Sequence, residues 1–234
     1  MAQADRILIS CEHGGNRIPA RYRPLFAGFE AMLRSHRGYD PGALALARAL
    51  AAALAAPLFV STTSRLLIDL NRSIGHPRLY SEATRNVPAT IRRAILESHY
   101  LPYRNRVEAA VAGAIARGGR VIHIAAHSFT PELDGSVRNA DVGLLYDPAR
   151  PGERALCRSW QIQLQACAPE LKVRRNYPYT GKSDGLAAHL RRLFPADAYV
   201  GIELEINQKH VMGDGRRWRV LMNQVIESLH QAMT

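Results

Sequence analysis

The sequence of 234 residues is poor in cysteine, and the few it has follow no recognisable pattern. Cys11, Cys157 and Cys167 form neither a Cys-x-x-Cys pair nor an even set. This excludes the disulfide framework of small secreted domains and fits a reducing compartment, so we expect a cytoplasmic protein. Residues 1–5 contain no basic region followed by an apolar run, so a signal peptide is not expected.

Long apolar runs are also missing. The longest apolar stretch, residues 43–60, is mostly alanine, is interrupted by Arg48 and contains Pro57 close to its end. A membrane-spanning helix needs about 20 predominantly apolar residues, so we expect no membrane association. There is no internal repeat, and no linker rich in proline, glycine or serine divides the chain.

Acidic and aromatic residues are scarce as well. There are 20 Asp and Glu against 31 Lys and Arg, which gives a net charge of +11, and only 7% of the residues are aromatic. The basic residues are scattered and form neither a basic tail nor a helix-turn-helix or RNP-like setting, so nucleic-acid binding is not expected. The excess of positive charge instead favours an arginine-rich surface together with a small acidic ligand.

What is present is an alternation of apolar strands and amphipathic helices. The expected strands are 7–10, 58–60, 66–70, 121–126, 142–146 and 199–206. The expected helices are 41–56, 89–117 with an interruption at Pro102, 153–167, 185–193 and 216–233. This order predicts one α/β domain over residues 1–234, with a mixed, mostly parallel sheet flanked by helices.

Polar residues follow four of the apolar runs. In parallel sheets the ligand site lies beyond the carboxyl ends of the strands, so these residues are the candidates for chemistry. The four segments are 10–16, 68–72, 124–128 and 201–207.

Two histidines and a carboxylate in these segments match the ligand set of a hydrolytic zinc site. His13 and His127 supply the histidines, and Glu12 or Asn16 supplies the third ligand. Zinc lowers the pKa of bound water to about 7, which suits attack on a carbonyl carbon. Each histidine alone is more often a hydrogen-bonded structural residue, and only the combination favours a Zn²⁺ cofactor.

The remaining segments supply a base and an anion clamp. Glu205 or Glu203 is positioned to accept a proton, although alternating glutamates are also typical of a solvated edge strand. Asn71 and Arg72 can bind a substrate carboxylate, or Arg72 can form a structural ion pair. A thiol hydrolase with Cys11 as nucleophile remains an alternative.

These segments together resemble the N-formylglutamate amidohydrolase family, over residues 7 to about 210. The order of the motifs is also similar to the zinc carboxypeptidase and aspartoacylase group, whose phosphorylase/hydrolase-like fold the resemblance implies. The matching motifs are CEHGGNRIP (11–19), SRLLIDLNR (64–72), HSF (127–129), NYPYTG (176–181) and ELEIN (203–207).

The resemblance implies a zinc-dependent hydrolase that removes the formyl group from N-formyl-L-glutamate, a late step of histidine degradation. It implies His13 and His127 as metal ligands and Glu205 as general base, with Asn71 and Arg72 holding a substrate carboxylate. We expect Glu12 as the third ligand, because a carboxylate binds Zn²⁺ better than the amide of Asn16 does.

Three further residues are expected to support binding of an acidic N-acyl amino acid. Arg65 is expected to neutralise a second carboxylate, and Tyr179 and Lys182 lie in a loop that could close over the site. His123, inside an apolar strand, is expected to be a structural histidine. A peptidase or deacylase acting on another substrate would use the same parts, so the acyl group stays open.

Overall fold

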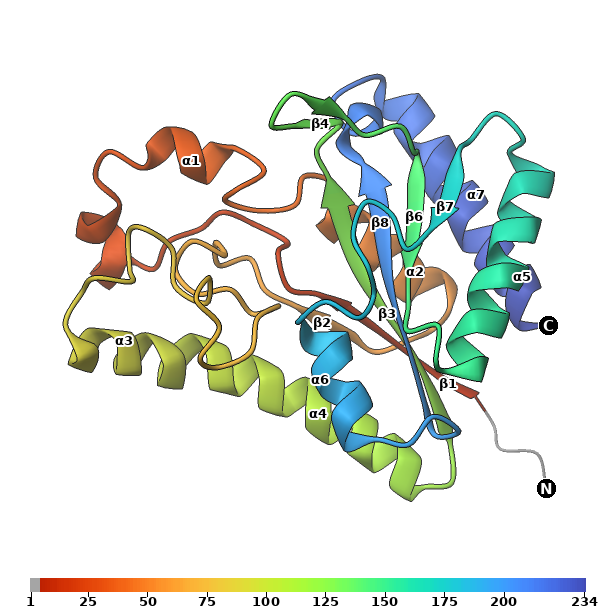
Figure 1. The fold of residues 1–234 in the computed structure, drawn as a ribbon, viewed down its shortest axis with the longest axis horizontal. Coiled ribbons are helices and arrows are strands. Elements are labelled where there is room, and N and C mark those ends of the chain that lie inside the picture. Colours follow the sequence, from red (N-terminus) through yellow and green to blue (C-terminus); the bar gives the residue numbers. More distant parts are fainter. Residues whose placement is uncertain (1–4) are drawn as a thin grey trace.

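A six-stranded sheet forms the centre of the computed structural model, which describes residues 5–234 (Figure 1). The strand order is β2-β1-β3-β8-β6-β7, in which β2, β1, β3 and β8 run parallel and β6 is antiparallel to β8. The mixed, mostly parallel sheet expected from the sequence is therefore confirmed. The strands are β1 (Asp5–Cys11), β2 (Leu58–Val60), β3 (Arg120–Phe129), β6 (Val142–Leu145), β7 (Val173–Arg175) and β8 (Tyr199–Asn207), and β4 (Glu132–Leu133) and β5 (Ser136–Val137) form a separate hairpin.

Helices cover both faces of the sheet. Helices α2, α5 and α7 pack on one face, and α4 and α6 pack on the other. Among residues 5–234, no helix combines the length and the apolar character needed to cross a bilayer. The helices are α1 (Glu30–Arg34), α2 (Ala43–Ala53), α3 (Ala89–Ile95), α4 (Leu101–Ala116), α5 (Pro151–Cys167), α6 (Leu186–Leu193) and α7 (Gly215–Met233), with shorter helical turns η1 (Ala20–Phe26), η2 (Leu96–Tyr100) and η3 (Gln208–His210).

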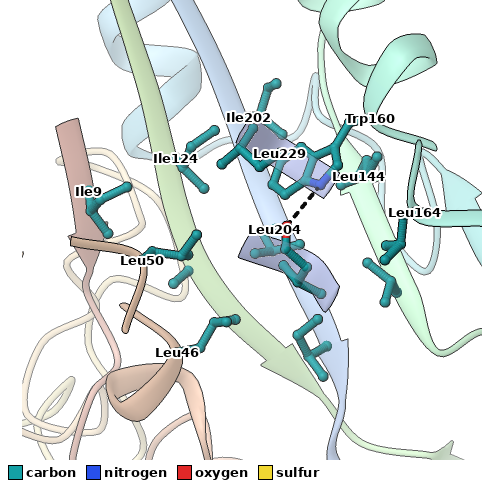
Figure 2. Packing of buried hydrophobic residues seen from close by; sticks show 14 of the residues in the cluster. Ile9, Leu46, Leu50, Ile124, Leu144, Trp160, Leu164, Ile202, Leu204 and Leu229 are labelled. Atoms are coloured by element: carbon teal, nitrogen blue, oxygen red, sulfur yellow. Dashed lines mark hydrogen bonds between the residues drawn. The ribbon is translucent and has the colours of Figure 1, made fainter. Parts of the chain in front are cut away.

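Side chains along β3 and β8 alternate between two faces of the sheet, one apolar and one with titratable groups. Ile124 and Ile202 are paired residues that point into the core under α2, α5 and α7 (Figure 2). Residues one position further along each strand point to the opposite face. His127 and Glu205 lie on that second face, also as a register pair. The central strands therefore carry an apolar face and a face with buried titratable groups.

The interruption expected at Pro102 is present. A π-helical turn, η2, joins α3 to α4 just before this proline. Proline lacks an N–H and clashes with the preceding turn, and a widened turn accommodates it.

Two expectations about strands were wrong. Residues 66–70 form turns and irregular backbone instead of a strand. Side chains bind the carbonyl oxygens of Leu66, Leu67 and Leu70; the hydroxyl of Thr84, for example, donates to Leu67 over 3.1 Å. Their apolar character reflects burial in the core on the α4 side of the sheet. Conversely, β7 was missed, because three residues reading Val-Arg-Arg give no apolar signal.

A buried ion pair ties the helices to the central strand. Glu153 of α5 is fully buried and accepts hydrogen bonds from Arg191 Nε over 2.9 Å and from the Gly201 N–H over 3.1 Å. Arg191 of α6 also donates to the carbonyl oxygens of Gly181 and Gly201. The pair thus joins α5, α6, β8 and the loop that precedes α6.

Replacing Arg191 with methionine is expected to lower the free energy of unfolding by about 3–5 kcal/mol, because the buried Glu153 carboxylate loses its cation. Arg192→Met is the matched control, since the neighbouring Arg192 is exposed and its loss should change stability by about 0.5 kcal/mol or less. Urea unfolding of both variants measures the difference. Equal losses would show that the Glu153–Arg191 pair contributes nothing specific.

Candidate active site

A cavity of about 330 Å³ opens at the carboxyl ends of the central parallel strands. His13 follows β1, His127 lies near the end of β3, and Glu203 and Glu205 lie in β8. All four line this cavity, as does Arg72. The structure therefore brings together residues from all four segments that the sequence singled out by position.

Two histidines and an aspartate converge at the base of the cavity. The Asp40 Oδ2 atom lies 2.9 Å from His127 Nδ1 and 3.4 Å from His13 Nδ1, and ligand atoms of the three residues lie within 4.8 Å of one another. All three residues are buried, and His13 Nδ1 has no hydrogen-bond partner. Two imidazole nitrogens and a carboxylate oxygen are the donor set of hydrolytic zinc sites, so these residues fit a zinc ion.

A carboxylate lies behind each imidazole. The Asp69 Oδ1 atom is 2.7 Å from His13 Nε2, and the Glu12 Oε2 atom is 3.2 Å from His127 Nε2. The Tyr103 hydroxyl donates to Glu12 Oε1 over 2.8 Å. Carboxylates in this position orient a ligating histidine and select which nitrogen faces the metal. Here they leave both Nδ1 atoms directed at Asp40.

The charges of this cluster support one another. Burial alone would raise the pKa of the Asp40 carboxyl, but His13, His127 and Arg65 hold it well below its usual range. Burial also raises the pKa of the Glu12 carboxyl, but contact with His127 outweighs this effect and lowers the pKa to about 2. Both carboxylates are therefore ionised at neutral pH and available to a cation or to its ligands.

Glu12 and Asn16, the two residues expected as the third ligand, are not among the three residues whose ligand atoms converge; the third member of that group is Asp40. The Glu12 carboxylate contacts His127 at Nε2, whereas Asp40 contacts the same ring at Nδ1. Asn16 is exposed and donates to the Leu33 carbonyl. Asp40 follows no apolar strand. Only its acidic side chain, in a loop that contains glycine and proline, could have pointed to it in the sequence.

Glu205 and Glu203 differ in the hydrogen-bond partners of their carboxylates. Each residue is only 7% exposed, because β8 lies between β3 and β6 and is not an edge strand. Glu205 Oε2 is buried without a partner, whereas Glu203 Oε1 accepts a hydrogen bond from Asn71 Nδ2 over 3.3 Å. Burial raises the pKa of Glu205 to about 8, although His127 opposes the shift. Of the two glutamates, Glu205 is the one with a fully buried carboxylate oxygen that lacks a partner.

Arg65 is already paired within the protein. Its guanidinium contacts Asp40 Oδ1 over 3.2 Å and Asp69 Oδ2 over 3.0 Å. The expectation that it neutralises a second substrate carboxylate is not favoured by this geometry, because two internal carboxylates already neutralise it. Arg65 instead fixes the two aspartates beside His13.

Arg72 lines the cavity and keeps one guanidinium nitrogen without an internal partner. Its Nη1 donates to the carbonyl oxygens of Asn71 and Asp184, while its Nε atom is buried without a partner. The Asn71 side chain is occupied, since it accepts from the Leu186 N–H and donates to Glu203. A Cβ added at Gly185 would lie 2.8 Å from Asn71 Oδ1, so glycine is needed there for this contact.

The loop at 176–182 contributes one of its two expected residues. Tyr179 lines the cavity, and its hydroxyl accepts a hydrogen bond from Arg138. Lys182 does not line it; its side chain is 62% exposed, and Nζ lies 3.7 Å from Asp147. Lys182 is thus directed to solvent, and no pattern in residues 176–182 distinguishes its orientation from that of Tyr179.

Cys11 and His123 are buried outside the cavity. Burial and the neighbouring Glu12 raise the pKa of the Cys11 thiol, and no part of the residue is exposed. A thiolate nucleophile at Cys11 is therefore unfavourable. His123 contacts Ser10 Oγ over 2.8 Å and the Tyr199 hydroxyl over 2.7 Å, which confirms its expected structural role.

Comparisons with solved structures agree with this fold. A gene product of Agrobacterium tumefaciens is 29% identical, with a TM-score of 0.82 over 97% of this chain and 90% of that one. The N-formylglutamate amidohydrolase of Ralstonia eutropha is 21% identical, with a TM-score of 0.70 over 99% of this chain and 94% of that one, and shows the shared fold. No curated protein matches the chain at a significant level.

The family model of N-formylglutamate amidohydrolases matches residues 5–212. That range contains the residues that line the cavity, from His13 to Gln208. The resemblance noted in the sequence is thereby confirmed. The chain belongs to the N-formylglutamate amidohydrolase family and is a hydrolase that acts on an amide bond.

Proposed function

We propose that this chain is a zinc-dependent amidohydrolase that removes the formyl group from N-formyl-L-glutamate. One observation carries the proposal: His13, Asp40 and His127 converge in a cavity that also contains the unpaired carboxylate oxygen of Glu205. Residues 1–234 would act as one catalytic domain. Cysteine usage and family membership support a cytoplasmic role in histidine degradation.

The zinc ion would be held by His13, Asp40 and His127. When bound, it would act as a Lewis acid that polarises the formyl carbonyl and makes water at the site more acidic. Glu12 and Asp69 keep the two imidazoles oriented from behind. Three atoms of this cluster, His13 Nδ1, His127 Nε2 and Glu12 Oε2, are buried without a hydrogen-bond partner, which supports a cation at this position.

Glu205 would transfer the proton. In hydrolysis, a water oxygen bonds to the formyl carbon, the carbon–nitrogen bond breaks, and formate and L-glutamate result. Glu205 Oε2 accepts the proton of the attacking water and delivers it to the leaving nitrogen. A pKa near 8 in a buried site falls toward neutrality beside a bound cation, which favours both steps of the transfer.

Arg72 would hold the α-carboxylate. The unpaired Nε atom and the remaining guanidinium N–H groups can bind a carboxylate in the cavity. A volume of about 330 Å³ is at the lower end of ligand sites, which suits an acylated amino acid better than a peptide. This observation favours the amidohydrolase over the carboxypeptidase-like alternative.

A substrate panel tests the proposal. The zinc-loaded enzyme is assayed on N-formyl-L-glutamate, N-acetyl-L-glutamate, N-formyl-L-methionine and a dipeptide ending in glutamate, each scored by kcat/KM. We expect N-formyl-L-glutamate to give the highest value. A higher value for N-acetyl-L-glutamate would indicate a different deacylase, and a higher value for the dipeptide would indicate a peptidase.

A further inference from the structure

Three arginines line the cavity, and only some of them are free to bind an anion. Arg65 is neutralised by Asp40 and Asp69. Arg72 donates to carbonyl oxygens and keeps an unpaired Nε. The exposed Arg78 takes part through its guanidinium in none of the ion pairs or hydrogen bonds found within residues 5–234. Two cations, Arg72 and Arg78, are therefore available.

The histidines that line the cavity near these arginines are His36 and His76. Burial and the nearby arginines lower the pKa of His36, so its ring is uncharged at neutral pH. His76 Nδ1 accepts a hydrogen bond from the Arg78 backbone N–H over 3.1 Å, so this nitrogen is already used within the protein. Permanent positive charge for an anionic ligand thus comes from Arg72 and Arg78.

Both arginines belong to one closed loop that is fixed to the metal cluster. The Asp69 N–H donates to the Leu79 carbonyl over 2.9 Å, which closes the loop at its base. The Arg72 N–H donates to the Asp69 carbonyl, and the Asp69 side chain contacts His13 Nε2. Compact loops with adjacent ends hold their side chains in fixed positions and are frequently functional. The loop therefore presents Arg72 from its start and Arg78 from its end.

We propose that Arg78 is the specificity residue that binds the side-chain carboxylate of an N-acylated dicarboxylic amino acid, while Arg72 binds its α-carboxylate. This inference rests on the proposed function and deepens it. Arg78 takes the role that the sequence suggested for Arg65, whose guanidinium is neutralised by Asp40 and Asp69. Lys182, the other cation expected near the substrate, is directed to solvent. An arginine can hold a carboxylate by two parallel hydrogen bonds, which gives direction as well as charge.

The test compares two substrates of nearly equal shape, N-formyl-L-glutamate and N-formyl-L-glutamine. In Arg78→Ala, the ratio of their kcat/KM values is expected to fall about 10- to 100-fold, mostly through a higher KM for the glutamate substrate. Arg85→Ala is the matched control, because Arg85 is exposed and does not line the cavity. Arg78→Lys should recover part of the preference. An unchanged ratio in Arg78→Ala would overturn the proposal.

A binding measurement separates this inference from the proposed reaction. Calorimetry in a Glu205→Gln background measures binding of both compounds without turnover. Tighter binding of N-formyl-L-glutamate that is lost on adding Arg78→Ala supports the specificity role, whatever bond the enzyme cleaves. Equal binding of both compounds by the Glu205→Gln protein would overturn it. Failure of the wild type to hydrolyse either compound would instead reject the proposed function.

Discussion

Replacing Glu205 with glutamine is expected to lower kcat on N-formyl-L-glutamate by about 10²- to 10⁴-fold, the usual contribution of a general acid–base group. The amide keeps the shape of the side chain but cannot accept the proton from water. KM should change much less, because the substrate carboxylates bind elsewhere in the cavity. Steady-state kinetics with the zinc-loaded variant measures both parameters.

Glu203→Gln is a closely matched control. Glu203 lies two residues away on the same strand, faces the same cavity and is 7% exposed like Glu205. Its oxygen already accepts a hydrogen bond from Asn71, so its loss should reduce kcat less. If Glu203→Gln loses more turnover than Glu205→Gln, the proton transfer has been assigned to the wrong glutamate.

Asp40→Asn is expected to weaken zinc binding by more than about 100-fold, whereas Glu12→Gln is expected to weaken it by about 10- to 100-fold. Asp40 would contact the ion, and Glu12 acts on it only through His127. Both changes replace a buried carboxylate by an amide. Competition with a chromophoric chelator measures zinc affinity independently of activity, and circular dichroism checks that both variants fold.

The opposite order of the two losses in zinc affinity would favour Glu12 as the third ligand. A larger loss in Glu12→Gln than in Asp40→Asn would mean that the His127 side chain turns to present Nε2 rather than Nδ1. Equal and small losses in both variants would remove the metal from this cluster altogether.

Three of the predicted site residues that line the cavity share one property, which is their place at or near the end of an apolar strand. His13, His127 and Glu205 could be found because parallel strands bring their carboxyl ends to one edge of a sheet. The sequence also indicated the mixed sheet and most helices, since their periodic patterns are long. These features depend on patterns of neighbouring residues along the chain.

Other features of the cavity could not be predicted from the sequence, because they depend on contacts between distant segments. Asp40 reaches the cluster from a loop 27 positions after His13, and nothing in its own surroundings marks it. Arg65 could be read as a substrate ligand, because its two carboxylate partners become visible only when the loops are placed together. The direction of the Lys182 side chain is likewise set by the path of its loop.

The glutamates of β8 show how topology changes the meaning of a pattern. Alternating charges are typical of a solvated edge, but β8 lies inside the sheet between β3 and β6. Glu205 is therefore buried next to its register partner His127. Strand order is set by the packing of the whole domain, so the sequence alone left both interpretations open.

The most direct measurement is a zinc titration of the metal-free protein, followed by formate release from N-formyl-L-glutamate. The proposed site predicts that activity rises in proportion to added zinc and reaches a plateau at about one ion per chain. The same titration of Asp40→Asn should give little activity at one equivalent. Full turnover by the metal-free protein, or one equivalent of bound zinc without any release of formate, would contradict the account.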